Sequence, residues 1–296
     1  MQLVASAGLV PTSARSLPPF KLHQPRSVAE ALSDLADQPG AVLLAGGSDL
    51  VAAFNEGLTP SALVSLKRVS AVHQVSADDS GLRIGAAITH GMGCSDPLLR
   101  AQAPGFAAAW SSIANPRIRF TGTLGGNLMA GRPRYEGAVL LSAAQARLEF
   151  ASLTGVQTIQ VPDLSSSLLQ ASAPAFQQPR LLTHIHLPTT DLVSYFYERS
   201  MRPLMTLAAA LRLRGDGLQL CVAVATEYLK PALLLLPLRA YALADVARQA
   251  RAIALDAFAQ LPADFADPVI TCDCARAAGT ALLARRLERL AGLAHV

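Results

Sequence analysis

Two pairs of adjacent glycines carry the main chemical signal in this sequence. The first lies in Leu43-Leu44-Ala45-Gly46-Gly47-Ser48-Asp49-Leu50 and the second in Thr123-Leu124-Gly125-Gly126-Asn127-Leu128. Paired glycines permit positive φ and let successive N–H groups point into one concavity, which suits phosphate oxygens. A helix that starts near Asp49 would add the N–H groups of its first turn, which favour an anion. One such loop indicates only a tight strand-to-helix turn, but two facing each other could clamp a diphosphate.

The two loops, together with Ile118-Arg119-Phe120-Thr121-Gly122 before the second, resemble a known family. It is the FAD-binding, or medium, subunit of molybdenum hydroxylases, which include xanthine, carbon monoxide, aldehyde and N-heterocycle dehydrogenases. The resemblance runs from near Phe20 to the last helix. It implies an α+β fold with a two-lobed FAD-binding domain of the PCMH (vanillyl-alcohol-oxidase-like) type. A small α+β C-terminal domain with a short antiparallel sheet and helices would follow.

The length of 296 residues favours two domains. We expect a mobile N-terminal segment at 1–19, the FAD-binding domain at 20–190 and the C-terminal domain at 191–296. Apolar residues make up 51% of the chain and charged residues 16%, which is more apolar than a solitary monomer usually is. This composition predicts a partner surface.

Composition also excludes several classes of protein. The net charge is +4, but aromatic residues are 5% and the basic residues are scattered, so we do not expect nucleic-acid binding. The apolar run at 232–238 contains Pro237 and is far shorter than the roughly 20 residues of a membrane span. Segment 1–19 lacks the basic and apolar regions of a signal peptide. The four cysteines, which have no iron–sulfur or zinc spacing, indicate a cytoplasmic protein with reduced thiols: Cys94, Cys221, Cys272 and Cys274.

The hydrophobic pattern predicts the elements that must position the two loops. Strands are expected at 20–25, 41–44, 62–66, 82–86, 147–152 and 181–188. Helices are expected after Ser27 and Thr89 and at 106–113, with a helix or strand at 138–146, whereas 154–178 has no regular pattern. In the second domain we expect a hairpin of 205–213 with 218–226, and helices at 242–261 and 275–293.

The resemblance implies that a bound flavin supplies the redox chemistry, while the protein binds, orients and tunes it. It assigns cofactor contacts to both loops: Ala45, Gly46, Gly47, Ser48, Asp49 and Leu50 in the first, and Thr123, Leu124, Gly125, Gly126 and Asn127 in the second. Ile113, ten residues before Thr123, matches a position that lines the cofactor, although ordinary helix core explains it equally well. Leu182 matches a strand position at the adenine end.

Several positions depart from the family pattern. Glu136 stands where an aspartate is usual; it would accept hydrogen bonds from ribityl or ribose hydroxyls, or else simply face solvent. Arg199 stands where a lysine near the flavin is frequent, and arginine keeps the charge but changes its shape. The run Arg132-Pro133-Arg134 replaces small polar residues; its cations could approach the diphosphate, but we expect them to face water. Phe120 stands where asparagine is common.

Two other groups of residues could have a function in binding a metal or a partner. His184 and His186 alternate on one strand, but two ligands without a third are weak, so we expect exposed histidines and not a metal site. On the last helix Arg285, Arg286 and Arg289 predict a solvated basic face. The chain has no molybdenum-pterin signature and no iron–sulfur cysteines. It should therefore not hydroxylate a substrate by itself.

These observations favour an FAD-binding electron-transfer subunit. Its partners would be an iron–sulfur subunit with 2Fe-2S clusters and a molybdenum subunit that holds molybdopterin. Electrons would pass from the clusters through FAD to NAD, oxygen or a quinone. One alternative is a free-standing FAD oxidoreductase with the same cradle, such as the enolpyruvyl-aminosugar reductases. Another is a non-catalytic scaffold whose flavin site has degenerated.

Overall fold

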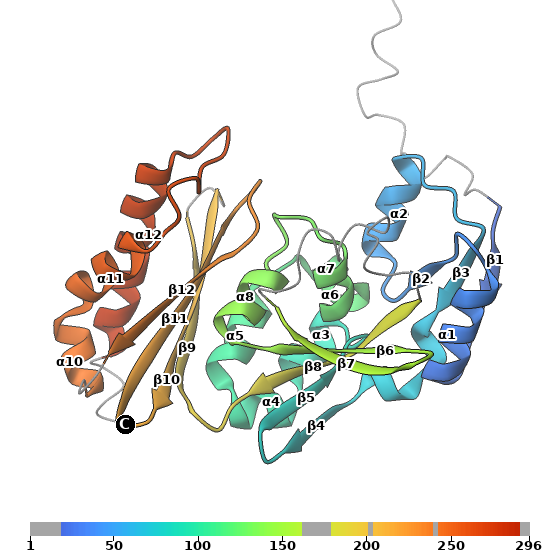
Figure 1. Cartoon of the computed structure of the whole chain (residues 1–296), viewed down its shortest axis with the longest axis horizontal. Helices are drawn as coiled ribbons and strands as arrows, with labels where there is room; N and C mark the ends of the chain where they lie inside the picture. Colours follow the sequence, from blue (N-terminus) through green and yellow to red (C-terminus); the bar gives the residue numbers. More distant parts are fainter. Residues whose placement is uncertain (1–18, 162–178, 201–203, 239–241, 291–296) are drawn as a thin grey trace, which may run out of the picture.

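The computed structural model describes residues 19–161, 179–200, 204–238 and 242–290. Its strands form three sheets that follow one another along the long axis of the molecule (Figure 1). We call the three parts the N-terminal lobe (β1 to η3), the central lobe (β4 to β8) and the C-terminal lobe (β9 to α12). The expected mobile segment at 1–19 lies outside the described residues, apart from Pro19.

The N-terminal lobe is a small parallel sheet covered by a capped helix. Its strands, in the order β1-β3-β2, are Lys21–His23, Ala62–Ser65 and Val42–Leu44. Helix α1, Val28–Asp37, begins after Ser27, whose hydroxyl accepts a hydrogen bond from the Glu30 N–H. The sequence Ser27-Val28-Ala29-Glu30 has the spacing of a capping box, but the Glu30 carboxylate accepts from the N–H of Arg26 and not from that of Ser27, so only half of the box forms. Helix α2 and the turns η2 and η3 complete the lobe: Ser48–Asn55, Leu66–Arg68 and Ser70–His73.

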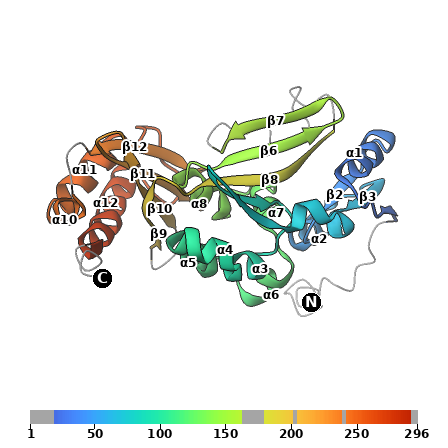
Figure 2. The same cartoon turned by 90° about the horizontal axis from the view of Figure 1, so that it is seen from below.

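The central lobe is a five-stranded antiparallel sheet with short helices gathered on one side, as Figure 2 shows. The strands, in the order β4-β5-β8-β6-β7, are Val75–Asp78, Gly81–Gly85, Arg180–Pro188, Arg147–Ser152 and Gly155–Gln160. The helices α3 to α8 are His90–Ser95, Pro97–Gln102, Pro104–Ser112, Pro116–Thr121, Leu124–Met129 and Gly137–Ala143. Prolines in the first turn start α4, α5 and α6, so the chain turns often and the helices stay short.

The C-terminal lobe is a four-stranded antiparallel sheet with helices on its outer face (Figure 1). The strands, in the order β12-β11-β10-β9, are Ala232–Leu238, Gly217–Thr226, Met205–Arg214 and Leu192–Arg199. Helices α10, α11 and α12 are Leu243–Arg248, Ala250–Ala259 and Cys272–Glu288. No helix in these described ranges is both long and apolar enough to cross a membrane.

Strand β10 is buried on both faces and joins the two halves of the molecule. Leu207 and Leu211 pack with the core of the C-terminal helices. Ala208 and Ala210 point the other way and pack with the core of the central lobe. Because alanine is small, this face of the sheet can lie close to α8, which contacts both β10 and β11. The three consecutive alanines, Ala208 to Ala210, therefore belong to a strand although alanine has a low β-propensity.

The buried side chain of Arg212 fixes this junction. It is fully buried on the alanine face of β10 and forms an ion pair with Asp191. Its guanidinium also donates to the carbonyl of Ala144, at the end of α8, and to that of Pro188, at the end of β8. One arginine thus ties the turn after α8 and the turn between β8 and β9 to β10, where the central and C-terminal lobes meet.

Most expected elements are present, with three corrections and an additional strand, β12, at 232–238, where no element was expected. Strand β7 forms inside the stretch that has no regular pattern, and the remainder of that stretch, 162–178, lies outside the described residues. Strand β12 forms despite Pro237 because it is an edge strand. The expected helix at 242–261 is divided at Gln249 into α10 and α11. Finally, the second glycine pair lies inside helix α7 and not in a loop.

Candidate functional site

The first glycine pair joins strand β2 to helix α2. Gly47 has a φ of 76°, a conformation that glycine adopts without strain, and it stands at the N-cap of α2. No side chain among the described residues caps this helix. The first N–H groups of a helix have no acceptor within it, so those at the start of α2 are available to a ligand. The six residues 45–50 are all partly buried and not fully buried, so the chain itself does not cover them.

Gly46 brings this loop against the segment before the second glycine pair. A Cβ at position 46 would overlap the carbonyl oxygen of Thr121 and lie 3.0 Å from the Cα of Gly122. Only a glycine allows such an approach between backbones. The two glycine-containing segments, which belong to different lobes, therefore meet directly.

The second glycine pair forms the first turn of helix α7. The Thr123 hydroxyl caps the helix by accepting from the Gly126 N–H at 3.0 Å. Gly125 is buried and donates its N–H to the carbonyl of Ala86 at 2.9 Å, where a Cβ would collide with that residue. Gly125 is thus a packing glycine. Gly126 and Asn127 are partly buried, and they are the members of this group that can face a ligand.

A buried histidine and the only tryptophan of the chain support the segment that leads into this helix. His90 donates its backbone N–H to the carbonyl of Gly122 at 2.9 Å. The indole N–H of Trp110 donates to Nδ1 of His90 at 2.8 Å, so the imidazole is neutral and carries its proton on Nε2. Burial, followed by the charge of Arg119, lowers the pKa of His90 to about 4. The imidazole therefore stays neutral near pH 7 and serves as a structural support.

Asn127 and Glu136 connect α7 to the start of α8. The Asn127 side-chain oxygen accepts from the Gly137 N–H at 3.0 Å, which leaves its amide NH₂ for another partner. The Glu136 side chain is 18% exposed and accepts from the hydroxyl of Tyr197 at 3.1 Å. Burial raises the pKa of Glu136, against the hydrogen bond from Tyr197 and the charge of Arg199. Glu136 is therefore not a solvent-facing side chain.

Arg199 lies beside Glu136 with its guanidinium toward that carboxylate. Its Nη1 is 3.9 Å from the Glu136 Oε1, and its side chain is 53% exposed. Glu198, the residue before Arg199, projects to the opposite face of β9. There the Glu198 carboxylate binds Arg285 at 3.4 Å and Arg286 at 3.0 Å. The expected solvated basic face of the last helix is thus partly an internal ion-pair cluster.

Asp49, in the first turn of α2, binds the segment that joins α7 to α8. Its Oδ1 accepts from Nε of Arg132 at 2.6 Å and from the Tyr135 hydroxyl at 2.8 Å. Arg132 also reaches Glu56 at 3.3 Å. The expectation that Arg132 faces water is wrong, whereas Arg134 is exposed and lies over the Tyr135 ring. Sequence reasoning missed Tyr135 because its partner is 86 residues away in the chain.

Three of the apolar candidates lie in the hydrophobic core. Ile113 and Leu124 are fully buried and Leu182 is 4% exposed, all in the core of the central lobe. The carbonyl of Ile113 accepts from Nε of Arg119 at 2.8 Å. Ordinary core packing explains these three side chains in the structure.

The two strand histidines are not exposed, contrary to expectation. The Glu149 carboxylate lies within 3.0 Å of His184 Nδ1 and 2.9 Å of His186 Nε2. It also accepts from Arg83 at 2.7 Å and from Thr183 at 2.9 Å. Although burial opposes it, these hydrogen bonds lower the pKa of Glu149 to about 2. In the described part of the chain, no three His, Cys, Asp or Glu side chains are grouped as a metal site.

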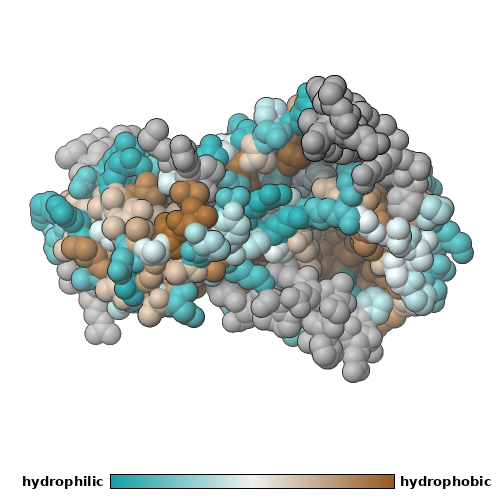
Figure 3. Space-filling view, turned by 90° about the horizontal axis from the view of Figure 1, so that it is seen from above, coloured by the Kyte–Doolittle hydropathy of each residue, from teal (hydrophilic) through white to brown (hydrophobic). Residues whose placement is uncertain are grey.

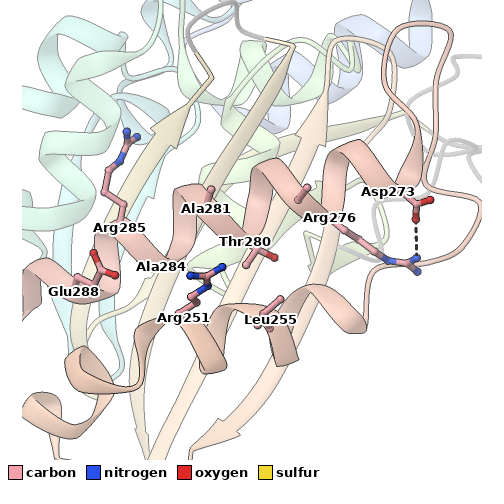
Figure 4. Close-up of a pocket in the computed structure, with 10 residues that line it drawn as sticks. Arg251, Leu255, Asp273, Arg276, Thr280, Ala281, Ala284, Arg285 and Glu288 are labelled. Carbon is pink, nitrogen blue, oxygen red and sulfur yellow. Dashed lines mark ion pairs between the residues drawn. The ribbon is translucent and has the colours of Figure 1, made fainter.

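An open groove lies between two helices of the C-terminal lobe. It has a volume of about 600 Å³ and runs between α11 and α12, with Arg251 and Leu255 on one wall and residues between Asp273 and Glu288 on the other (Figure 4). Its floor is made of small side chains such as Ala281 and Ala284. No residue predicted to bind a cofactor lines it, so we do not identify it with the cofactor site.

The glycine segments fit an extended diphosphate ligand better than this groove does. They offer unpaired helix N–H groups, a close backbone approach at Gly46 and a positive φ at Gly47. The hydroxyl of Ser48, the first residue of α2, adds a possible donor beside them. Figure 3 shows a hollow with hydrophobic walls in the half of the molecule that holds the N-terminal and central lobes. An apolar hollow suits a flat ring system, and free N–H groups at a helix start suit a diphosphate.

Comparison with known proteins gives a consistent picture. The family described as the FAD binding domain in molybdopterin dehydrogenase matches residues 18–190. The putative xanthine dehydrogenase FAD-binding subunit of Escherichia coli K12 is 30% identical over 56% of this chain and 56% of its own length. The xanthine dehydrogenase FAD-binding subunit of Escherichia coli O157:H7 is 30% identical over 66% of this chain and 68% of its own. The carbon monoxide dehydrogenase medium chain of Afipia carboxidovorans is 29% identical over 67% of this chain and 70% of its own.

Solved structures share the fold over nearly the whole chain. Quinoline 2-oxidoreductase from Pseudomonas putida 86 has a chain that matches with a TM-score of 0.76 at 22% identity, over 95% of this chain and all of that one. A chain of carbon monoxide dehydrogenase from Hydrogenophaga pseudoflava matches with a TM-score of 0.69, also at 22% identity, over 93% of this chain and 96% of that one. The family match covers more than half of the chain and includes both glycine segments. The chain therefore belongs to the family of FAD-binding subunits of molybdenum hydroxylases.

Proposed function

We propose that this chain is the electron-transfer subunit of a molybdenum-containing hydroxylase, in which it holds FAD. The observation that carries this proposal is the meeting of Gly46 with the segment at Thr121, beside the uncapped start of α2. Membership of an FAD-binding family supports it. A bound FAD would supply the transfer of electrons between one-electron and two-electron partners.

The residues of the chain would hold the cofactor in three ways. Backbone N–H groups of residues 45–50, with the Ser48 hydroxyl, would bind the diphosphate, aided by the helix dipole of α2. The free amide of Asn127 and the backbone at Gly126 would bind from α7. Glu136 would accept hydrogen bonds from ribityl or ribose hydroxyls. The buried residues, which would shape the cavity from its protein side, are Ile113, Thr123, Leu124, Gly125 and Leu182.

We further propose the domain division at residue 190. The family match ends there, and Arg212 ties the following turn at Asp191 to the central lobe. On this division, 20–190 would bind FAD and 191–296 would brace it through the alanine face of β10.

The names of the relatives support the proposed partners. They describe subunits and medium chains of larger dehydrogenases. The partners of this chain would be an iron–sulfur subunit with 2Fe-2S clusters and a subunit with molybdopterin, which would oxidise the organic substrate. Electrons would leave through FAD to NAD, oxygen or a quinone, in the cytoplasm.

Co-expression of the chain with its genomic neighbours tests this proposal. We expect a hetero-oligomer that contains FAD, iron and molybdenum in fixed ratios and oxidises an organic substrate. A flavin-containing chain that purifies alone and turns over a substrate by itself would instead support a free-standing oxidoreductase. A chain that assembles with partners but binds no flavin would support a scaffold.

A further inference from the structure

Asp49 poses an electrostatic problem for the proposed cofactor site. It lies in the first turn of α2, where the helix offers its free N–H groups to an anion. A carboxylate at this position suits the helix dipole but repels a diphosphate. The helix start can therefore serve an anionic ligand well only if something neutralises Asp49.

Arg132 is placed to do this. Its Nε donates to the Asp49 Oδ1 at 2.6 Å, and its Nη2 lies 3.3 Å from an oxygen of Glu56, at the other end of α2. The Arg132 and Asp49 side chains are only 28% and 29% exposed, so the pair is partly shielded from water. These hydrogen bonds raise the pKa of Arg132, and the guanidinium keeps its charge at any ordinary pH.

The Arg132–Asp49 ion pair also links the two glycine segments. Arg132 belongs to residues 130–136, which join the end of α7 to the start of α8. Tyr135 adds a second attachment to Asp49, with a hydroxyl distance of 2.8 Å. This connection therefore crosses from the helix that carries the second glycine pair to the helix that follows the first.

We propose that Arg132 is a positioning residue that neutralises Asp49, and so allows the N-terminus of α2 to accept a diphosphate. This inference rests on the proposed FAD site. It makes an asymmetric prediction about the two members of one ion pair. Removing the cation leaves an uncompensated carboxylate in the first turn of α2, whereas removing the carboxylate leaves no negative charge there.

The substitutions Arg132→Gln and Asp49→Asn test the asymmetry. Asp49→Asn keeps a side-chain oxygen that can accept from both Arg132 and Tyr135, so the connection stays attached while the negative charge is lost. Arg134→Gln is the matched control. Arg134 lies two residues after Arg132 and carries the same charge, but its side chain is exposed. The double variant Arg132→Gln/Asp49→Asn restores the charge balance.

The measurement is the dissociation constant of FAD, obtained by titrating the flavin-free protein and following flavin fluorescence. ADP, which carries the diphosphate without the ring system, is titrated in competition. We expect Arg132→Gln to weaken both ligands about tenfold or more at low salt, with a smaller effect at high salt. Asp49→Asn should bind FAD as tightly as the unchanged protein or more tightly. The double variant should recover to within about threefold, and Arg134→Gln should stay within about twofold.

Chemical denaturation of the flavin-free variants provides the structural control. Arg132→Gln and Asp49→Asn could instead lose FAD affinity equally and in proportion to their lost stability. That result would overturn the inference, because the ion pair would then have only a structural role. Unchanged affinity in Arg132→Gln would also overturn it. If the unchanged protein binds neither FAD nor ADP, the proposed function itself fails, and the inference fails with it.

Discussion

The bare Cα of Gly46 lies against the carbonyl oxygen of Thr121, so closely that a Cβ at position 46 would overlap that oxygen. This contact joins the loop after β2 to the end of α6, which belong to different lobes. It places the start of α2 beside the segment that leads into α7. The geometry of the proposed cradle depends on it.

Gly46→Ala should therefore affect folding as well as cofactor binding. The added methyl group must push the two segments apart, which we expect to lower the free energy of unfolding by about 1–3 kcal/mol and to weaken FAD binding. Gly91→Ala is a suitable control, because its Cβ would lie 3.2 Å from the carbonyl oxygen of Arg119, a much milder contact. Denaturation curves and FAD titrations of both variants would check this. Full flavin occupancy and unchanged stability in Gly46→Ala would show that the segments do not meet here.

The buried His90 should make stability depend on pH. Its folded pKa of about 4 is below the ordinary value of 6.5, so the unfolded chain binds the proton more readily. The destabilising effect of His90 protonation is therefore absent well above pH 6.5, and the free energy of unfolding falls as the pH drops from 6.5 toward 4. Between pH 7.5 and pH 5 the loss should be about 2 kcal/mol.

Urea denaturation followed by the fluorescence of Trp110, the only tryptophan in the chain, measures this effect. His90→Gln keeps an acceptor for the indole N–H but does not titrate, so its pH slope should be shallower. His184, whose pKa burial also lowers, contributes equally to both proteins. Glu149, with a folded pKa of about 2 against an ordinary 4.5, contributes below this range. Identical slopes in the two proteins would contradict the assignment to His90.

Arg212 and Arg214 bind the same carboxylate, that of Asp191, but differ in burial. Arg212 is fully buried, whereas the Arg214 side chain is 46% exposed. Arg212→Met fills the space but removes the donors to two backbone carbonyls, and should cost about 3 kcal/mol of unfolding free energy. Arg214→Ala should cost less than about 1 kcal/mol. If chemical denaturation shows that both variants lose the same unfolding free energy, burial at the junction does not determine how much each arginine stabilises the fold.

The charge at Arg199 should tune the bound flavin. Reduction adds negative charge, which a nearby cation stabilises, so Arg199→Ala should make the flavin harder to reduce while Arg199→Lys recovers most of the change. The pairing with Glu136 moderates this effect, so Glu136→Gln should make the flavin easier to reduce. Redox titration of the four flavin-loaded proteins would check both directions. Identical midpoint potentials would place Arg199 too far from the flavin to matter.

The sequence predicts the local parts of the site well. Caps at Ser27 and Thr89 and the turn at Gly215 depend on residues near in the chain, and all are confirmed. The second glycine pair was expected in a loop because glycine is a poor helix former. The Thr123 cap and the packing of Gly125 on Ala86 overcome that tendency.

Contacts between distant residues could not be predicted from the same signals. The exposure expected for Arg132, His184 and His186 was wrong, because their carboxylate partners lie at least 35 residues away in the chain. Nothing in the local pattern around Arg132 indicates Asp49. The Glu149 pairs form only when β6 and β8 lie side by side in the central sheet, and the Asp49–Arg132 pair forms only when the N-terminal and central lobes meet.

Identification of the bound flavin tests the central claim most directly. The purified protein, reconstituted with a mixture of flavins and washed, is denatured with acid, and the released cofactor is identified by chromatography and quantified per chain. We expect one FAD per chain and no FMN, because the two glycine segments together would hold a diphosphate. Release of FMN, or of no flavin at all, would contradict it.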